Sequence, residues 1–304
     1  GLERAGFKIN SFNSEINKYA NQVYKNNFKN STYVGSVADV RGSDLPRINA
    51  ITFGSPCQDF SLAGKQKGMG GERSSLILEA IRLVKECRPD FFIWENVKGT
   101  FSSNSGEDFA AILQAFTNIG GYRLEWQLLN TKWFLPQNRE RVYLVGYTSN
   151  KSGGQIFPIT RESKGTIENN KINIGSARTR KYMNQAQKLE IRNDNSTNTL
   201  TSVQKDNYVL GYSRDRKGKV MSRHKKKLAN TLHASSGSGN NTDQFINSIR
   251  KLTPLECERL QGFPDDWTKF GTEGLISNTQ RYKMCGNAVT VDVVEAVGKQ
   301  ILKL

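Results

Sequence analysis

Short apolar runs and longer amphipathic segments alternate along the first half of the chain. Apolar residues at helical spacing predict helices, and short continuous apolar runs predict buried strands. The predicted helices cover residues 2–7, 15–28, 74–87 and 109–119, and the predicted strands cover residues 8–12, 50–53, 90–94, 122–129 and 142–147. Strands that alternate with helices of this length are typical of an α/β fold, in which helices cover both faces of a mostly parallel sheet.

This rhythm stops near residue 150 and returns near residue 250. The part between is rich in Asn, Ser, Thr and Gly and has short strand-like pieces such as residues 208–212. Two similar pieces, Asn198-Thr199-Leu200 and Asn230-Thr231-Leu232, are either paired strands that each present a polar loop or a coincidence of β-propensity. Helical spacing over residues 252–261 and 289–302 predicts two helices that pack back onto the first part. We therefore expect three parts, at residues 1–149, 150–249 and 250–304, of which the second is a smaller, mainly β or irregular domain.

Positive charge is concentrated in the middle part. The 304 residues include 44 Lys and Arg against 28 Asp and Glu, which gives a net charge of +16 and a pI near 9.7. Residues 151–250 hold 19 basic and 7 acidic side chains, a net charge of +12, whereas residues 251–304 hold 7 of each. Such a balance indicates an acidic polymer as partner, and its position assigns that partner to the middle part.

Several classes of protein are disfavoured by features that the sequence lacks. It has four cysteines, and no two of them form a Cys-x-x-Cys pair. They are Cys57, Cys87, Cys257 and Cys285. We therefore expect neither a disulfide framework nor a metal site, and we expect a cytoplasmic location. No apolar run reaches the roughly 18 residues that span a bilayer, so no membrane partner is expected. The chain begins with Gly-Leu-Glu, and we expect the natural protein to begin earlier.

One cysteine stands where a predicted strand gives way to a glycine-rich loop. In Gly54-Ser55-Pro56-Cys57-Gln58 the thiol lies at the sheet edge where ligands bind, and the glycines within residues 64–71 would let the loop close over a substrate. A free thiol has a pKa of ~8.5, so a nucleophilic role requires nearby positive charge or a helix dipole. The chain has only two histidines, His224 and His233, both in the middle part, so acyl transfer by a Cys-His pair is disfavoured. Alone, this segment favours a structural cysteine over a catalytic one.

A carboxyl group and two guanidinium groups occupy comparable positions. Glu95 follows the apolar strand at residues 90–94, where burial would hold its proton near neutrality. Arg139 and Arg141 enter the strand at residues 142–147 at alternate positions, so both can point into one pocket. Taken singly, the glutamate would be interpreted as a helix cap and the arginines as surface charges.

Together, Cys57, Glu95 and the pair Arg139 and Arg141 resemble, in order and interval, the cytosine-C5 DNA methyltransferase family of bacteria and phages. The resemblance runs nearly end to end, through residues 1–7, 13–15, 54–61, 73–76, 95–97, 137–143, 250–264 and 286–289. It implies a Rossmann-like domain that binds S-adenosylmethionine, formed by the first and third parts, and a target-recognition domain in the middle part. The implied enzyme is a sequence-specific DNA (cytosine-5-)-methyltransferase of the kind found in restriction-modification systems.

The mechanism that the resemblance implies fits the chemistry of these groups. The Cys57 thiolate would add to C6 of a cytosine flipped out of the duplex, because a stacked base is out of reach. Glu95 would hydrogen-bond the N3/N4 edge and donate the proton that makes C6 electrophilic, and Arg141, with Arg139 nearby, would bind O2. C5 would accept the methyl group of S-adenosylmethionine, and loss of the C5 proton with release of Cys57 would leave 5-methylcytosine.

The resemblance also implies residues that bind the cofactor. Glu15 matches the acidic residue that binds the ribose hydroxyls, as carboxylates after the second strand do in dinucleotide folds. The adenine position departs from the family pattern, because Ser36, with Val37, stands where an acidic residue is usual, and Asp39 is its rival. The remaining implied contacts are Gly1, Leu2, Ile16, Pro56, Leu76, Asn287 and Val289.

The glycine-rich turn that contacts the cofactor in this family should precede residue 1. Omission from the sequence, a second polypeptide that carries the turn, and an inactive derivative would each explain this, and we expect omission. Circular permutation is disfavoured, because the tail ends soon after Asn287 without such a turn.

In this family the target-recognition domain reads base edges with hydrogen-bonding side chains and phosphates with Lys and Arg. The run Arg223-His224-Lys225-Lys226-Lys227 is expected to contact phosphates, and an exposed solvated face is the alternative. The other expected DNA contacts are Gln58, Ser61, Thr201, Thr231, Ser235, Ser236 and Arg250. The expected partner is double-stranded DNA, bound by a monomer, with a cognate restriction endonuclease as a further candidate.

Two other functions are compatible with these residues. A sequence-specific DNA-binding subunit without activity would explain the missing glycine-rich turn. An RNA methyltransferase of the same fold would use the same catalytic groups, although the long basic segment disfavours it.

Replacing Lys225, Lys226 and Lys227 by Gln should weaken binding to all duplex sequences similarly, because phosphate contacts carry no sequence information. The slope of log K against log salt should flatten by about 0.9 for each phosphate that these lysines neutralise. Fluorescence anisotropy over a salt series measures both. A variant with Lys8, Lys299 and Lys303 replaced by Gln removes the same charge outside the middle part, and equally weakened binding by that variant would contradict the assignment.

Overall fold

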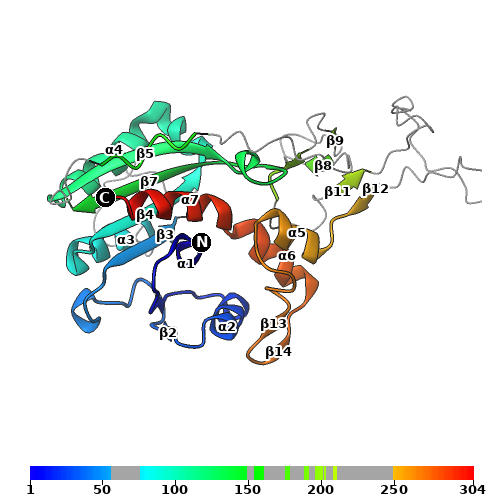
Figure 1. The fold of residues 1–304 in the computed structure, drawn as a ribbon, viewed down its shortest axis with the longest axis horizontal. Helices are drawn as coiled ribbons and strands as arrows, with labels where there is room; N and C mark the ends of the chain where they lie inside the picture. The colour runs from blue at the N-terminus through cyan, green and yellow to red at the C-terminus, as the bar shows by residue number, and fades with distance from the viewer. Residues whose placement is uncertain are drawn as a thin grey trace, which may run out of the picture.

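The computed structural model describes residues 1–55, 76–148, 154–160, 175–178, 188–191, 196–200, 202, 208–210 and 249–304 (Figure 1). Its centre is a four-stranded sheet of order β3-β4-β7-β5. These strands are β3 (Ala50–Gly54), β4 (Phe91–Val97), β5 (Tyr122–Asn130) and β7 (Glu140–Thr148). Each strand begins within two residues of the start of its predicted apolar run. Each ends at most three residues beyond the end of that run.

The sheet is mixed: β3, β4 and β5 run in one direction, as a mostly parallel sheet requires, and β7 runs opposite to them. β3 and β4 run parallel, but β7 pairs antiparallel with both β4 and β5. Only the 3-10 turn η5 (Thr131–Trp133) and the two-residue strand β6 (Gln137–Asn138) separate β5 from β7. A parallel pair needs a crossover of a dozen or more residues, so this short connection allows only an antiparallel pair.

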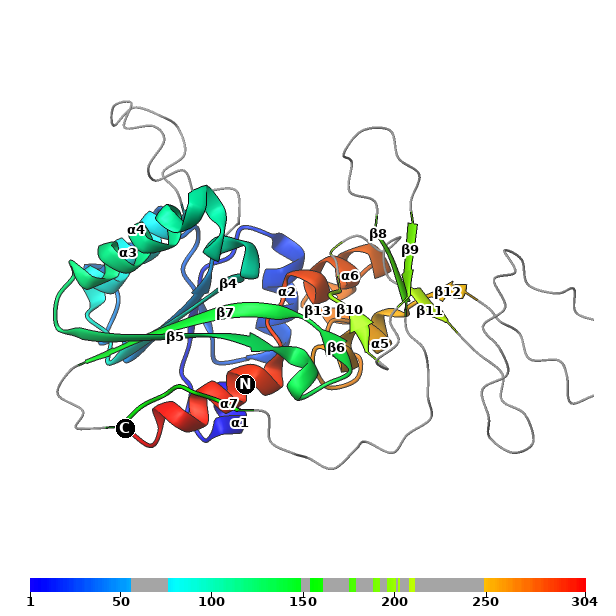
Figure 2. The same ribbon diagram turned by 90° about the horizontal axis from the view of Figure 1, so that it is seen from above.

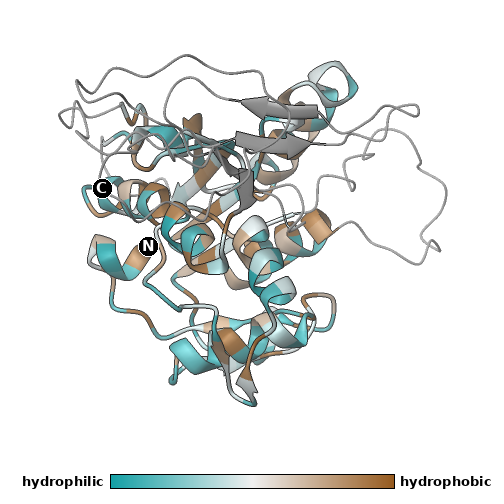
Figure 3. Ribbon diagram, turned by 90° about the vertical axis from the view of Figure 1, so that its right-hand side faces the viewer, coloured by the Kyte–Doolittle hydropathy of each residue, from teal (hydrophilic) through white to brown (hydrophobic). Residues whose placement is uncertain are grey.

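Helices cover both faces of the sheet, as predicted (Figure 2). α3 (Leu76–Cys87) and α4 (Glu107–Thr117) pack on one face, and α1 (Leu2–Ala5) and α7 (Val291–Ile301) pack on the other. Amphipathic spacing explains this placement, because each long helix presents an apolar stripe to the sheet. In Figure 3 hydrophobic and hydrophilic residues accordingly alternate along the helices.

Strand β4 is apolar throughout its first four residues because it is buried on both sides. Phe92 and Trp94 join the cluster under α3 and α4, whereas Phe91 and Ile93 join the cluster under α7. Gly146 of β7 lies opposite Phe92, and a Cβ atom on it would stand 2.2 Å from the Phe92 ring. The glycine therefore lets the ring lie flat against the sheet.

A smaller unit precedes the sheet. β1 (Phe12–Asn13) and β2 (Thr32–Tyr33) form a parallel pair around α2 (Lys18–Asn27). The predicted strand at residues 8–12 therefore lies further along the chain, and the helix predicted from residue 15 begins at Lys18. The cause of the later start is Asn17, whose side chain accepts hydrogen bonds from the next turn's N–H groups and caps the helix.

The remaining elements lie in the middle and final parts. The 3-10 helices are η1 (Gly42–Asp44), η3 (Lys98–Phe101) and η4 (Ser103–Gly106). The short strands are β8 (Gly175–Arg178), β9 (Lys188–Ile191), β10 (Thr197–Asn198), β11 (Tyr208–Leu210), β12 (Ile249–Lys251), β13 (Phe270–Gly271) and β14 (Gly274–Leu275). The final helices before α7 are α5 (Pro254–Leu260) and α6 (Asn278–Asn287). The division into three parts stays a prediction.

Helix α6 has no counterpart among the predicted helices. Its buried face includes Arg281, which a hydrophobic pattern counts as polar. Glu258 of α5 is fully buried and forms an ion pair with Arg281 at 3.0 Å, so the two charges neutralise each other inside the protein. The pair is recognisable only once both helices are placed.

Side chains of the edge strand β5 hold the segment that leads toward the middle part. The Glu125 carboxylate accepts the N–H groups of Ile156 and Phe157 at 2.9 and 3.1 Å. The Gln127 amide both donates to and accepts from the main chain of Ile159. These bonds hold residues 156–159 against β5. Among the described helices, none is long and apolar enough to cross a membrane.

Gly146→Ala should lower the free energy of unfolding by about 1–3 kcal/mol or more, because the added methyl group overlaps the fully buried Phe92 ring. Urea titration followed by tryptophan fluorescence measures the change. Gly99→Ala is the control, because its Cβ atom would meet only Val97 at an ordinary 3.9 Å. An unchanged midpoint for Gly146→Ala would contradict the packing described.

Candidate active site

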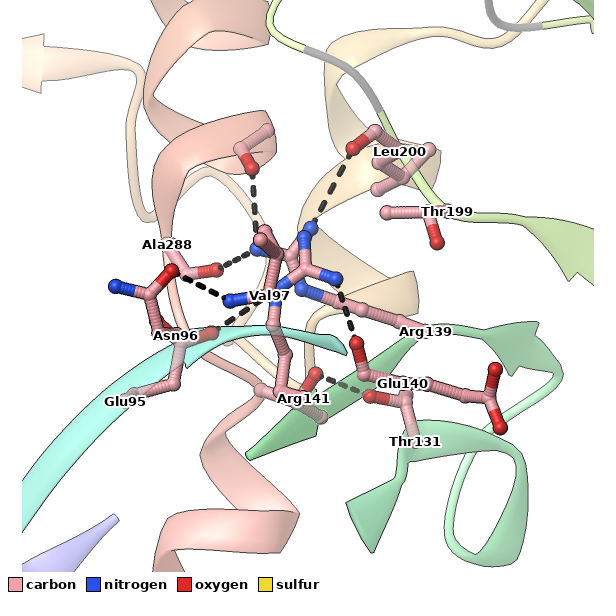
Figure 4. Close-up of polar contacts among 12 residues, drawn as sticks. Glu95, Asn96, Val97, Thr131, Arg139, Glu140, Arg141, Thr199, Leu200 and Ala288 are labelled. Carbon is pink, nitrogen blue, oxygen red and sulfur yellow. Dashed lines mark hydrogen bonds and ion pairs between the residues drawn. The ribbon is translucent and has the colours of Figure 1, made fainter. Parts of the chain in front are cut away.

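A buried carboxylate and a guanidinium group meet on one face of the sheet. Glu95 pairs with Tyr143 across β4 and β7, and Arg141 stands two residues before Tyr143, so their side chains are diagonal neighbours. Arg141 Nε lies 3.1 Å from Glu95 Oε1, with side-chain exposures of 15% and 14% (Figure 4). Glu95 was expected in the loop after the strand, but β4 continues to Val97, and the ladder to β7 holds the carboxylate rigidly.

Burial controls the protonation of this carboxyl group. Loss of solvent raises the pKa of Glu95 above its ordinary value of 4.5, and the positive charges of Arg141 and Arg139 oppose that rise. Gly54 at the end of β3 lies beside it, and a Cβ atom there would stand 3.3 Å from Glu95 Oε2. The site therefore combines a carboxyl group of raised pKa with nearby positive charge.

Asn96 holds Ser55, which stands just before the segment that contains Cys57. Its side-chain amide, on a residue 2% exposed, donates to the carbonyl oxygen and the hydroxyl of Ser55 at 2.9 and 3.0 Å. Trp94 Nε1 also donates to the Ser55 hydroxyl at 3.1 Å. Ser55 stands two residues before Cys57, which lies outside the described residues together with Pro56, Gln58 and Ser61. The sequence pattern assigned no role to Asn96. Its position directly after Glu95 in an apolar strand was the signal that could have indicated one.

The two predicted catalytic arginines differ in their contacts. Arg141 reaches Glu95, whereas the Arg139 guanidinium donates to the main-chain carbonyls of Leu200, Gly286 and Ala288. The alternation expected of a strand does not extend to Arg139, because β7 begins at Glu140. A catalytic role for Arg139 stays a prediction.

Two predicted cofactor segments meet beyond the ends of β1 and β2. The Ser14 hydroxyl donates to the Gly35 carbonyl at 2.8 Å, and the Tyr33 hydroxyl donates to the Glu15 carbonyl at 3.1 Å. Glu15 is exposed, and the apolar Ile16 beside it is 82% exposed. A carboxylate next to an uncovered apolar side chain is suited to a ligand with hydroxyl groups and a flat ring.

The segment after Gly35 is held by Arg82 of α3, a residue that the sequence pattern missed. Its guanidinium donates to the carbonyls of Val37 and Val40 at 3.1 and 2.9 Å. Ser36 lies at the start of the turn that this contact supports, and its carbonyl accepts the Asp39 N–H at 2.9 Å. Asp39 is exposed, so both adenine candidates remain on one turn.

The other predicted cofactor residues lie on three helices. Asn287 ends α6 and is exposed, and Val289 follows it half-buried. Leu76 begins α3 and is 42% exposed. Gly1 and Leu2 instead lie against α7, where a Cβ atom on Gly1 would stand 2.7 Å from Val294. Cofactor contacts of all five residues stay predictions.

Most predicted DNA contacts fall outside the described residues, namely Thr201, Arg223, Lys225, Lys226, Lys227, Thr231, Ser235 and Ser236. The backbone of Arg250 lies in β12, which pairs antiparallel with β11. This pairing confirms the strand predicted near residues 208–212, as far as Leu210. Within the described ranges, no group of three or more His, Cys, Asp or Glu could hold a metal ion.

Comparison with known proteins places this site in context. The family described as C-5 cytosine-specific DNA methylase matches residues 1–303. The chain is 30% identical to the type II methyltransferase M.Bsp6I of Bacillus sp. strain RFL6, and the match covers 100% of this chain and 94% of that protein. It is 33% identical to the type II methyltransferase M1.ScrFI of Lactococcus lactis subsp. cremoris, with 100% and 76% covered.

Solved structures of similar fold include methyltransferases from eukaryotes. The Entamoeba histolytica methyltransferase EhMeth superposes with a TM-score of 0.64 at 17% identity, covering 99% of this chain and 94% of that one. The Dnmt2 methyltransferase of S. pombe superposes with a TM-score of 0.61 at 20% identity, with the same coverage. At these identities the likeness establishes the fold alone.

The raised pKa of Glu95 predicts that the difference in stability between the unmodified chain and a Glu95→Gln variant changes with pH. The folded state holds this proton more tightly than the unfolded chain, so the associated stability is lost as pH rises above about 4.5. The Glu95→Gln variant lacks this loss, so its free energy of unfolding should improve relative to the unmodified chain as pH rises from about 4.5 to about 7.5.

Glu86→Gln is the matched control of opposite sign. The Gly42 N–H and Arg82 lower the pKa of Glu86, so its stabilisation is present above pH 4.5 and lost below it. This variant should therefore become less stable relative to the unmodified chain as pH rises from about 3 to about 4.5, and the difference should change little above that. Urea titrations from about pH 3 to about pH 7.5 measure both. A Glu95→Gln variant that gains no relative stability above pH 4.5, or a Glu86→Gln variant that loses none below it, would refute the electrostatic description.

Proposed function

This chain belongs to the family of C-5 cytosine-specific DNA methylases and is a DNA (cytosine-5-)-methyltransferase, and on that premise we propose that Cys57, Glu95 and Arg141 perform its chemistry. The observation that carries the proposal is the contact between Glu95 and Arg141 at 3.1 Å in a largely buried site. Asn96 supports it further, because it anchors Ser55, from which the chain continues to the nucleophile.

The first step is addition to the ring. The Cys57 thiolate attacks C6 of a cytosine extruded from the duplex and forms a C6–S bond. Glu95 gives its proton to N3 as electrons move into the ring, and burial of its carboxyl group keeps that proton available. Arg141, held beside Glu95, donates to O2 and stabilises the charge that develops there.

The second step transfers the methyl group and restores the ring. S-adenosylmethionine, when bound, supplies an electrophilic methyl group to C5. Cys57 keeps C5 nucleophilic while it remains bonded to C6, because the ring is then an enamine. Loss of the C5 proton to a base, return of the N3 proton to Glu95 and cleavage of the C6–S bond release Cys57 as thiolate, and the product is 5-methylcytosine.

The residues around Glu15 fit S-adenosylmethionine. The Glu15 carboxylate is an acceptor for two ribose hydroxyls, and the uncovered Ile16 side chain offers an apolar surface to the adenine ring. Ser36 and Val37 stand on the neighbouring turn, held by Arg82. This arrangement supports the assignment of these residues to the cofactor.

The basic middle part is proposed to read one short sequence of double-stranded DNA. The net charge of +12 over residues 151–250 supports a role in phosphate binding. We further propose that the protein protects DNA from a cognate restriction endonuclease, because its relatives M.Bsp6I and M1.ScrFI are named type II methyltransferases. A cytoplasmic location and a monomeric state stay predictions.

Cys57→Ser should abolish turnover while DNA binding persists, because a serine hydroxyl is far less nucleophilic than a thiolate. Incorporation of tritium from labelled S-adenosylmethionine into mixed-sequence duplex DNA measures turnover, and anisotropy measures binding. Cys87→Ser is the control, because Cys87 lies at the far end of α3 and should leave incorporation unchanged. Near-normal incorporation by Cys57→Ser would refute the mechanism, and better methylation of tRNA than of DNA would refute the substrate.

A further inference from the structure

The buried guanidinium group of Arg139 makes no contact that the proposed chemistry requires. The residue is 3% exposed, and its three side-chain hydrogen bonds all reach main-chain carbonyls. The distances are 3.4 Å to Leu200, 3.2 Å to Gly286 and 2.7 Å to Ala288 (Figure 4). In the part of the chain that the structure describes, no carboxylate forms an ion pair with Arg139.

These carbonyls belong to two segments that are distant in sequence. Leu200 follows β10, which pairs in parallel with β6, the strand just before Arg139. Gly286 and Ala288 flank Asn287, the proposed cofactor contact at the end of α6. One side chain therefore joins the residue just before the catalytic strand to Leu200 of the middle part and to the cofactor side of the return segment.

The buried amide of Gln137 makes the same two connections, because it accepts the Leu200 N–H at 3.0 Å and donates to the Leu260 carbonyl of the return segment at 2.7 Å. Gln261 braces the return segment itself: it donates to the Cys285 carbonyl at 2.6 Å and accepts the Thr290 hydroxyl at 3.0 Å. Both glutamines have no exposed surface. Because each bond is shielded from water, water does not compete with these donors for the carbonyl groups. The bonds therefore fix the relative positions of the three segments.

Arginine is suited to this junction for a geometric reason. Its guanidinium presents five N–H donors in a rigid planar fork, whereas a lysine ammonium is a single point at the end of a flexible stem. Lysine at position 139 could satisfy one of the carbonyls of Gly286 and Ala288 but not hold both at a fixed separation. Loss of the fork would leave buried carbonyls without a donor.

We propose that Arg139 is a positioning residue that holds the Gly286–Ala288 backbone, and with it Asn287, against the catalytic strand. The same side chain fixes Leu200, so the cofactor side and one segment of the DNA-reading part share an anchor. This inference rests on the proposed function, because Asn287 is a cofactor contact only there. It assigns contact with the cytosine to Arg141 alone of the two arginines.

The test compares cofactor affinity with turnover in the full chain. Isothermal titration with S-adenosylhomocysteine, without DNA, should show about tenfold weaker binding to Arg139→Lys, equivalent to about 1.4 kcal/mol. Its kcat at saturating cofactor and DNA should fall less than its affinity. Arg141→Lys should show the reverse, with affinity retained and kcat reduced by about 100-fold or more.

Val84→Ala controls for a general loss of stability, because Val84 is fully buried on the opposite face of the sheet. It should lower the melting temperature yet bind S-adenosylhomocysteine normally. Unchanged affinity in Arg139→Lys with a kcat loss equal to that of Arg141→Lys would overturn the proposal, as would equally weakened binding by Val84→Ala. Absence of tritium incorporation by the unmodified chain would instead contradict the proposed function, and the affinity comparison would still decide the role of Arg139.

Discussion

The antiparallel ladder between β4 and β7 is the constraint on which the rest of the molecule depends. Its register places Glu95 and Arg141 as diagonal neighbours on one face and Phe92 opposite Gly146 on the other. A shift of one residue in the pairing of β4 with β7 would move the Glu95 carboxylate to the other face of the sheet, where it would meet the apolar cluster under α3 and α4. The tight packing of Phe92 against Gly146 makes that slip costly, so the core and the active site enforce the same register.

Burial gives the site its chemistry at an energetic cost. Removing Glu95 and Arg141 from water opposes folding, and a buried ion pair seldom repays its desolvation. The pair is therefore better explained by function than by stability, because the same burial raises the pKa of the carboxyl group. The large apolar clusters on both faces of the sheet supply the stability that this arrangement needs.

Buried hydrogen bonds join the parts of the chain that the long middle segment separates. Gln137 and Arg139 bond to main-chain groups of the return segment, at Leu260 and Ala288, and of Leu200 in the middle part. Such bonds do not depend on the side chains of the residues they hold. The middle part can therefore differ in length and composition while its attachment to the catalytic sheet stays the same.

Hydrophobic periodicity alone was enough to recognise α3, α4 and the strands of the central sheet, because amphipathic stripes and buried runs are local features. The order and spacing of Cys57, Glu95 and Arg141 indicated the chemistry through their resemblance to a known family. Other features needed partners distant in sequence. The antiparallel course of β7, the inward-facing Arg281 of α6 and the carbonyl contacts of Arg139 each depend on a segment elsewhere in the chain, and only folding brings those segments together.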